Sequence, residues 1–133
     1  MAKPCQVLPG FLGHLGLEFL EVGPDRAAVR LEIGPQHHQT YAIVHGGVWC
    51  SLVETIASAG ADAWFEAGHV VGVSNTTNFL RPVAEGSVVA TALPVLRTDR
   101  RQLWTVDITG PDGRLVAHGK VELQNIVTDE NAR

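Results

Sequence analysis

The chain has 133 residues, of which 45% are hydrophobic and 18% are charged, and its formal net charge is −4. This length fits one domain and leaves no room for a second independent core. The sequence has no block of Lys or Arg, which argues against a nucleic-acid partner, because such binding depends on clustered cationic side chains that neutralise phosphates.

The small share of charged residues suggests that other subunits cover part of the surface. A small domain has a high ratio of surface to volume, and charged residues make up about 25% of an average soluble protein. We therefore expect a homo-oligomer.

The two cysteines, Cys5 and Cys50, lack the spacing of metal ligands and are too few for a disulfide framework. Prolines and glycines interrupt the first 20 residues, which contain no apolar run of the signal-peptide type. No segment is long enough to span a bilayer. The sequence therefore predicts a cytoplasmic protein.

The first predicted elements are a short helical turn at residues 8–14 and two strands at residues 15–22 and 26–33. The strands flank Gly23-Pro24-Asp25, a turn-forming triplet. In the second strand, hydrophobic residues occupy every other position, as expected for a half-buried strand. Residues 34–44 are expected to form a polar loop that contains histidines.

A long helix is predicted at about residues 46–67. Apolar residues and a glycine recur along one face at spacings of three or four: Trp49, Val53, Ile56, Gly60 and Trp64. Residues 57–61 are all small, so we expect the helix to lie close to a sheet that wraps around it. Gly68 is expected to end the helix as its C-terminal glycine.

Four strands are predicted after the helix, at residues 70–80, 87–97, 103–110 and 115–124. Asp112-Gly113, before the last of them, is a strong hairpin signal. The pattern predicts an α+β domain, with an antiparallel sheet around one central helix. A single domain is expected over residues 1–133, with its core at about 10–125 and a polar tail at 128–133.

The segment most informative about chemistry is residues 39–47, which ends in His45-Gly46-Gly47 where the long helix begins. The first amides of a helix lack internal partners and lie at the positive end of its dipole. Glycines let another molecule approach such amides, which can stabilise the oxyanion of an acyl transfer. Taken alone, the triplet also fits an ordinary turn between a loop and a helix.

Polar residues form a stripe along the same helix. Glu54 and Ser58 are one turn apart and share a face, and Ser51 and Asp62 lie close to it. A helix with two tryptophans and many small residues should be covered on most sides. We therefore expect this stripe to be buried for a functional reason rather than to face water.

These motifs together resemble the hotdog-fold thioesterases of the phenylacetic-acid-pathway type, over about residues 10–125. The resemblance is carried by Gln39, His45-Gly46-Gly47, Glu54, Ser58 and Asn78-Phe79-Leu80-Arg81-Pro82. Gln39 lies six residues before His45, and Glu54 lies nine after it. Many members carry Asn and Asp at those two places. Gln, Glu and a Ser one turn later are closer to the branch that acts on hydroxybenzoyl-CoA and dihydroxynaphthoyl-CoA.

The resemblance implies a hotdog fold and hydrolysis of an acyl-CoA with an aromatic or medium-chain acyl group. Glu54 would be the nucleophile or a general base, and the Gly46 amide would polarise the thioester carbonyl. His45 would orient the site, and Gln39 would hold the carbonyl or the attacking water. Ser58 would position the acyl group or the water.

The resemblance also implies that the site forms between two subunits. The helix of one subunit would meet the loop of its neighbour, and the strand at residues 70–80 would pair with its copy. Homotetramers built as dimers of dimers are common in this family. Coenzyme A would enter as part of the substrate, without a further cofactor, and an acyl carrier protein stays open as the alternative thiol carrier.

Four residues on or after the strand at 70–80 are candidate substrate contacts. Arg81 could bind the phosphates of coenzyme A or simply be solvated. Asn75 and Thr77 could reach the acyl pocket or be ordinary strand residues, and Phe79 could line that pocket or belong to the core or an interface.

We expect no metal site. His37 and His38 precede His45 in the same loop, but adjacent histidines in an extended loop point in different directions. The sequence has no second ligand cluster with metal spacing.

Two other functions are compatible with the fold that the resemblance implies. Hydratases or dehydratases of this fold generally pair a histidine with an aspartate or glutamate for proton transfer at carbon, and a non-catalytic protein would only bind acyl-CoA. Gln39, His-Gly-Gly and Glu54 favour the thioesterase over the first, and an intact carboxylate at Glu54 argues against the second.

Overall fold

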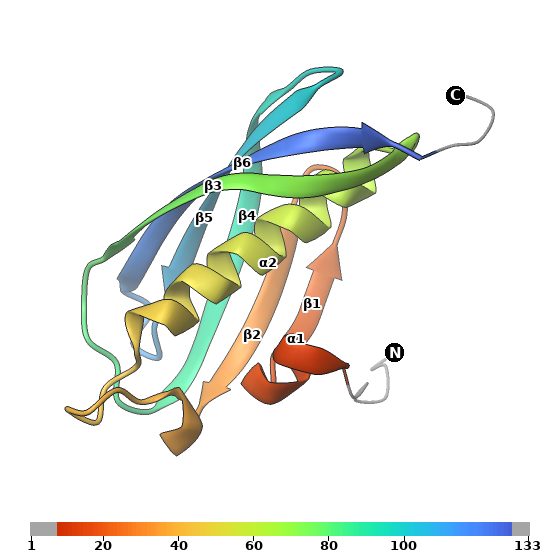
Figure 1. Cartoon of the computed structure of the whole chain (residues 1–133). Helices are drawn as coiled ribbons and strands as arrows, with labels where there is room; N and C mark the ends of the chain where they lie inside the picture. Colours follow the sequence, from red (N-terminus) through yellow and green to blue (C-terminus); the bar gives the residue numbers. More distant parts are fainter. Residues whose placement is uncertain (1–7, 129–133) are drawn as a thin grey trace.

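A computed structural model of the chain describes residues 8–128 and confirms the predicted α+β architecture. Within these residues an antiparallel sheet of six strands has the order β1-β2-β4-β5-β6-β3. The long helix α2, Gly46–Trp64, lies along the concave face of this sheet, and β3 and β6 arch over it (Figure 1).

The predicted elements are present, with ends that differ by a few residues. The structure contains α1 (Gly10–Leu15), β1 (Glu18–Val22), β2 (Ala27–Ile33), the 3₁₀ turn η1 (Pro35–His37), α2, β3 (Gly68–Phe79), β4 (Gly86–Arg97), β5 (Arg101–Thr109) and β6 (Leu115–Val127). Among the helices of the described range, none is long and apolar enough to cross a membrane.

The predicted polar tail at 128–133 lies outside the described residues except for Thr128. The backbone amide of Thr128 donates a hydrogen bond to the carbonyl of Ala67, at 3.1 Å. This first residue of the predicted tail is therefore attached to the segment between α2 and β3.

The prediction that Gly68 ends the long helix is wrong. The helix ends at Trp64, and the amide of the capping residue Phe65 donates to the carbonyl of Ala61 at 3.1 Å. Gly68 is instead the first residue of β3. A Cβ atom at this position would lie 1.9 Å from the carbonyl oxygen of Ile126, so glycine is required here by the close approach of β6.

The small residues of α2 bring the helix close to the sheet, as predicted. A Cβ atom on Gly60 would lie 2.7 Å from the indole of Trp104, and one on Gly119 of β6 would lie 2.5 Å from Val53. Any larger side chain at either glycine would push the helix and the sheet apart, because packed interiors leave no spare volume.

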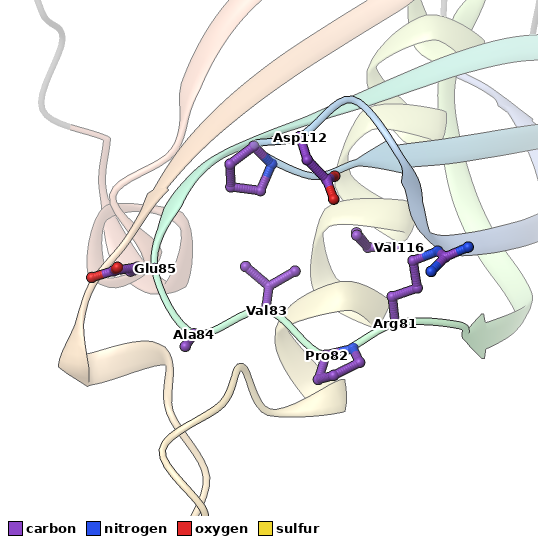
Figure 2. A pocket seen from close by; sticks show the side chains of 8 residues that line it. Arg81, Pro82, Val83, Ala84, Glu85, Asp112 and Val116 are labelled. Atoms are coloured by element: carbon purple, nitrogen blue, oxygen red, sulfur yellow. The ribbon is translucent and has the colours of Figure 1, made fainter.

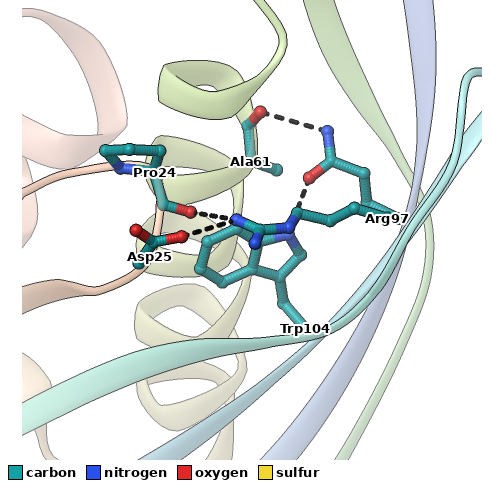
Figure 3. Close-up of polar contacts among 6 residues, drawn as sticks. Pro24, Asp25, Ala61, Arg97 and Trp104 are labelled. Atoms are coloured by element: carbon teal, nitrogen blue, oxygen red, sulfur yellow. Dashed lines mark hydrogen bonds and ion pairs between the residues drawn. The ribbon is translucent and has the colours of Figure 1, made fainter.

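A buried polar network attaches the C-terminal part of α2 to the sheet. The Gln102 amide nitrogen donates to the carbonyl of Ala61 at 3.1 Å and to the side-chain oxygen of Asn125 at 2.8 Å. Its oxygen accepts a hydrogen bond from the Trp104 indole at 2.8 Å, and the links to Ala61 and Trp104 can be followed in Figure 3. Gln102 is 1% exposed, so these partners replace the water that its amide loses on folding.

Arg97 makes a second connection at the same end of the helix. Its guanidinium donates to the carbonyl of Pro24 at 2.6 Å and pairs with Asp25 at 3.1 Å (Figure 3). It also lies 5.2 Å from the centre of the Trp64 ring, within the range of a cation–π contact. Arg97 therefore joins β4, the β1–β2 turn and the end of α2.

We expect Gln102→Leu to lower the free energy of unfolding by about 2–5 kcal/mol, because it leaves the Trp104 indole N–H and the Asn125 side-chain oxygen buried without a partner. Urea unfolding followed by tryptophan fluorescence measures this change. Gln124→Leu is the matched control, since Gln124 is an exposed glutamine of β6, and its effect should stay within about 0.5 kcal/mol. Equal effects of the two substitutions would contradict a stabilising role for the network.

Candidate active site

The start of α2 presents an unpartnered backbone donor. His45 is the N-cap, and its Nδ1 accepts a hydrogen bond from the amide of Gly47 at 2.7 Å. The neutral His45 ring therefore carries its proton on Nε2. The amide of Gly46 has no hydrogen-bond partner in the part of the chain that the structure describes, so it is a free donor at the positive end of the helix dipole.

The loop before the helix orients the side chain of Gln39. The Gln39 amide donates to the carbonyl of Ile43 at 2.8 Å, and its own carbonyl accepts from Ala42 at 3.0 Å. Ala42 adopts a left-handed backbone conformation, with φ of 59°, inside this turn. The Gln39 side-chain oxygen accepts from the Tyr41 amide. Its Nε2 group makes no hydrogen bond within residues 8–128, so both of its hydrogens are available to another acceptor.

A cavity of about 300 Å³ brings four of the predicted residues together. Its lining consists of Gln39, Ile43, Val44, Gly46, Trp49, Phe79, Leu80, Arg81 and Pro82. A Cβ atom on Gly46 would lie 2.5 Å from the ring of Phe79, so this ring rests against the backbone of Gly46. Gln39, Gly46, Phe79 and Arg81 are called the loop group below.

A second cavity, of about 260 Å³, shares Arg81 and Pro82 with the first (Figure 2). Asp112 and Glu85 also line it. Asp112 pairs with Arg114 at 3.5 Å, whereas the Arg81 side chain has no ion pair within residues 8–128. Arg81 is therefore an available cation between two cavities.

Glu54 and Ser58 lie further along α2, do not line either cavity, and are called the helix group below. The expectation that the polar stripe is buried is wrong for the single chain, since Glu54 and Asp62 are exposed and Ser58 is half-buried. Asp62 pairs with His69 at 3.1 Å. In the sheet formed by the described residues, β3 is an edge strand without a further strand beside it, which leaves this stripe of α2 exposed.

The Gly46 amide and the Glu54 carboxylate lie at different places along α2. Glu54 follows Gly46 by eight residues on a continuous helix, which separates their Cα atoms by about 12 Å at 1.5 Å per residue. Groups that act on one carbonyl must each approach it to about 3 Å. The loop group and the helix group of a single chain are therefore separated along α2, and of the two only the loop group lines the cavity.

Gly72 is a residue of the site that sequence reasoning missed. A Cβ atom on Gly72 would lie 3.9 Å from the carboxyl carbon of Glu54, so Gly72 is the part of β3 beside this carboxylate. The available signal was a glycine inside a strand pattern, which often marks a bulge or a close approach. The β3–β6 register does shift between Gly72 and Ser74.

Asn75 and Thr77 have partners within the protein. The Asn75 amide nitrogen donates to the carbonyl of Cys50 at 2.9 Å, and the Thr77 hydroxyl donates to the Asn75 side-chain oxygen at 2.7 Å. Both side chains therefore lie in the interface between β3 and α2. Contact of either with an acyl group stays a prediction.

The histidines of the loop bind backbone groups. His37, which is 2% exposed, accepts from the Gly34 amide at 2.9 Å and donates from Nε2 to the Leu15 carbonyl at 2.7 Å. His38 donates from Nε2 to the carbonyl of Ala84, also at 2.7 Å. Across the described residues, no three His, Cys, Asp or Glu side chains are grouped to hold a metal ion.

Known proteins share both the sequence pattern and the fold. A model of the thioesterase superfamily matches residues 41–117. The Mycobacterium tuberculosis protein named "Putative esterase Rv1847" is 46% identical over 92% of this chain and 91% of its own. Its solved structure superposes with a TM-score of 0.87, covering 89% of this chain and 97% of that one.

Two further relatives carry more specific names. The solved thioesterase HI1161 of Haemophilus influenzae is 31% identical, with a TM-score of 0.84 over 92% of this chain and 86% of that one. The 1,4-dihydroxy-2-naphthoyl-CoA hydrolase of Listeria monocytogenes is 33% identical over 80% of this chain and 88% of its own. The Escherichia coli PaaI protein, at 22% identity and a TM-score of 0.80 over 86% of this chain and 83% of its own, shares the fold.

The His45 cap generates a prediction about stability. His45→Ala removes the acceptor of the Gly47 amide and should lower the free energy of unfolding by about 1 kcal/mol, whereas His45→Asn, a good N-cap, should restore most of it. Urea unfolding of the three proteins measures this difference. If alanine and asparagine destabilise equally, the His45 ring does not act as a cap.

Proposed function

The chain belongs to the thioesterase superfamily, and from this premise we propose that it hydrolyses the thioester of an acyl-coenzyme A to a free acid and coenzyme A. Relatives named as a thioesterase and as a CoA hydrolase support this reaction. The observation that carries the proposal is a pair of donors on one cavity, the Gly46 amide and the Gln39 Nε2 group, which have no hydrogen-bond partner among the described residues.

The two donors suit a thioester carbonyl oxygen. When water or a carboxylate adds to the carbonyl carbon, this oxygen becomes an oxyanion, and donors already aimed at it stabilise the charge without reorganisation. The dipole of α2 adds to the effect at Gly46. His45 assists indirectly, because its ring holds the neighbouring Gly47 amide and fixes the first turn.

Glu54 supplies the second chemical function, in one of two ways. As a general base, its carboxylate takes a proton from water while the water oxygen attacks the carbonyl carbon. As a nucleophile, it forms a mixed anhydride that water then hydrolyses. In both cases one water is consumed, the C–S bond breaks, and the thiolate of coenzyme A leaves and takes up a proton. Ser58, one turn later, would position the water or the acyl group.

A second copy of the chain would bring the two halves of the site together. Within residues 8–128 the strand β3 pairs with β6 alone and its other edge is open, with Val71 at 50% and Val73 at 49% exposure. An open edge of this length is rare in a monomer, because it invites pairing with another strand. We therefore infer an antiparallel pairing of β3 with its copy across a two-fold axis.

One register of this pairing would bring the two parts of the proposed site together. The Phe79 ring rests on Gly46, and Gly72 lies beside Glu54. A two-fold axis between Asn75 and Thr76 would place Phe79 opposite Gly72 of the partner subunit. The cavity of one subunit would then lie next to Glu54 of the partner subunit, and the polar stripe would be covered.

The lining of the cavity supports an aromatic acyl group, because Phe79, at 58% exposure, offers a flat apolar surface. The Listeria relative is named for an aromatic acyl-CoA. Arg81, free of ion pairs in the described chain, would bind the phosphates of coenzyme A at the rim. The proposal requires no cofactor beyond the coenzyme A of the substrate.

Assembly beyond the dimer would use a different surface. Leu93, Val95 and Leu96 of β4 are each about half exposed, and a patch of this kind is a candidate contact between two dimers. The proposed location is the cytoplasm, which suits the free thiol of Cys50.

We expect Glu54→Gln to lower kcat for thiol release by about 10³-fold or more, because the amide can neither accept a proton nor attack. Release of free coenzyme A from a panel of aromatic and aliphatic acyl-CoAs is followed with a thiol reagent. Binding of the same acyl-CoAs, measured by calorimetry, should be retained. Glu66→Gln, which changes an exposed glutamate beyond the end of α2, is the matched control and should keep full activity.

Failure of the wild type to release thiol from any acyl-CoA that it binds would contradict the thioesterase assignment. Hydratase activity on unsaturated acyl-CoAs would then be measured. Full activity of Glu54→Gln would keep the thioesterase assignment but show that Glu54 has no catalytic role.

Mixing two inactive variants tests whether the site is shared. Glu54→Gln and Gln39→Ala chains, refolded together in equal amounts, should regain about a quarter of the wild-type activity, because half of the dimers are mixed and each mixed dimer has one intact site. Neither variant alone should show this activity. No recovery in a mixture that contains mixed dimers, as shown by differently tagged chains, would place both groups of each site in one chain.

A further inference from the structure

The strand β3 changes the face that it presents to α2 at a β-bulge. The pairing with β6 shifts its register between Gly72 and Ser74, so Val73 is an extra residue in β3. Before the bulge, Val70 packs against the core and Gly72 lies beside Glu54. The helix-facing residues up to this point therefore have even numbers.

Beyond the bulge, the helix-facing residues have odd numbers. Asn75 binds the carbonyl of Cys50, and the ring of Phe79 rests on Gly46. Thr77 also faces the helix. It pairs with Gly119 of β6, and a Cβ atom on Gly119 would lie 3.0 Å from the Thr77 hydroxyl and 2.5 Å from Val53 of α2. The bulge thus turns Asn75 and Thr77 towards α2, as bulges near active sites commonly do.

The contact of Asn75 is made at the helical turn that carries Glu54. In an α-helix the carbonyl of Cys50 accepts the amide hydrogen of Glu54, four residues later. A carbonyl oxygen has two lone pairs, so it can also accept the Asn75 amide hydrogen at 2.9 Å. Three residues earlier in β3, a Cβ atom on Gly72 would lie 3.9 Å from the Glu54 carboxyl carbon, so the backbone of β3 runs beside this carboxyl group. The hydrogen bond from Asn75 therefore defines where this turn lies relative to the strand.

We propose that Asn75 is a positioning residue for Glu54, acting through the carbonyl of Cys50, and that Thr77 orients the Asn75 amide for this task. The role rests on the proposed hydrolysis, because it concerns the placement of the carboxylate used there. The Thr77 hydroxyl donates to the Asn75 oxygen at 2.7 Å, which keeps the nitrogen directed at the helix.

Placement matters more for Glu54 than for an ordinary surface carboxylate. Its carboxyl group is exposed in the chain and makes no hydrogen bond or ion pair within residues 8–128. The position of the carboxylate is therefore defined by the helix turn beneath it. A shift of about 1 Å in a reacting group can lower the rate by about 10²-fold.

The test compares wild type, Asn75→Ala, Thr77→Val and Thr77→Ser by kcat and KM for thiol release from an aromatic acyl-CoA. Asn75→Ala should lower kcat by about 10- to 100-fold, with KM changed by less than about threefold. Thr77→Val, which keeps the shape and loses the hydroxyl, should lower kcat by a smaller factor. Thr77→Ser, which keeps the hydroxyl, should stay close to wild type.

Asn125→Ala is the matched control for a purely structural asparagine. The Asn125 amide donates to the carbonyls of Thr98 and Asp99 and accepts from Gln102, at the far end of α2. This variant should lose thermal stability at least as much as Asn75→Ala, yet keep the kcat of its folded fraction. Equal kcat for the two variants at equal folded fraction would overturn the positioning role. A raised KM with unchanged kcat in Asn75→Ala would overturn it as well, and would make Asn75 a substrate contact.

Hydrogen–deuterium exchange gives a reading that does not depend on a substrate. Peptides covering residues 50–58 should exchange faster in Asn75→Ala than in wild type, whereas Asn125→Ala should leave them unchanged. Unchanged exchange in Asn75→Ala would overturn the positioning role even if hydrolysis is established. Absence of thiol release in the wild type, by contrast, would contradict the proposed function and leave the exchange result to decide whether Asn75 holds this turn.

Discussion

The close packing of α2 against the concave face of the sheet is the constraint on which the rest of the structure depends. Gly60 lies under the Trp104 indole and Gly119 lies under Val53, where any side chain would collide with its neighbour. Because the helix lies this close, its backbone carbonyls come within hydrogen-bonding reach of sheet side chains. Gln102 binds the carbonyl of Ala61 near one end of the helix, and Asn75 binds that of Cys50 nearer the other. These two hydrogen bonds therefore define the position of the helix on the sheet.

A rigid helix that carries both an amide donor and a carboxylate imposes a distance between them. The Cα atoms of Gly46 and Glu54 are separated by about 12 Å along the axis, so the two groups lie apart in a single chain, as the proposed two-chain site requires. The open edge of β3 lies beside the exposed Glu54, and the loop group lies at the other end of the same strand. The low charge of the sequence, the exposed stripe on α2 and the open edge all agree with assembly of two chains around β3.

Much of the site could be predicted from spacing along the chain. His45, Gly46 and Glu54 lie on or at the start of one helix, and a helix converts sequence spacing directly into position. Gln39 and Gly46 line one cavity, since the loop between them is short, and their catalytic roles stay predictions. Burial of the polar stripe was not predicted correctly for the single chain, since periodicity shows which residues share a face but not which neighbour covers it.

The sequence by itself determined the order of the elements, the α+β class, the apolar face of α2 and the small residues that allow close packing, because these are local properties of propensity and period. Only the tertiary structure decided the role of Gly68. It is the first residue of β3, and it must be glycine because β6 lies too close for a side chain. The tertiary structure also decided which side chains of β3 face the helix, because a strand alternates with period two and one extra residue at Val73 reverses every assignment after it. Asn75 and Thr77 reach the helix for that reason, and a bulge depends on pairing with β6, which no pattern within β3 can show.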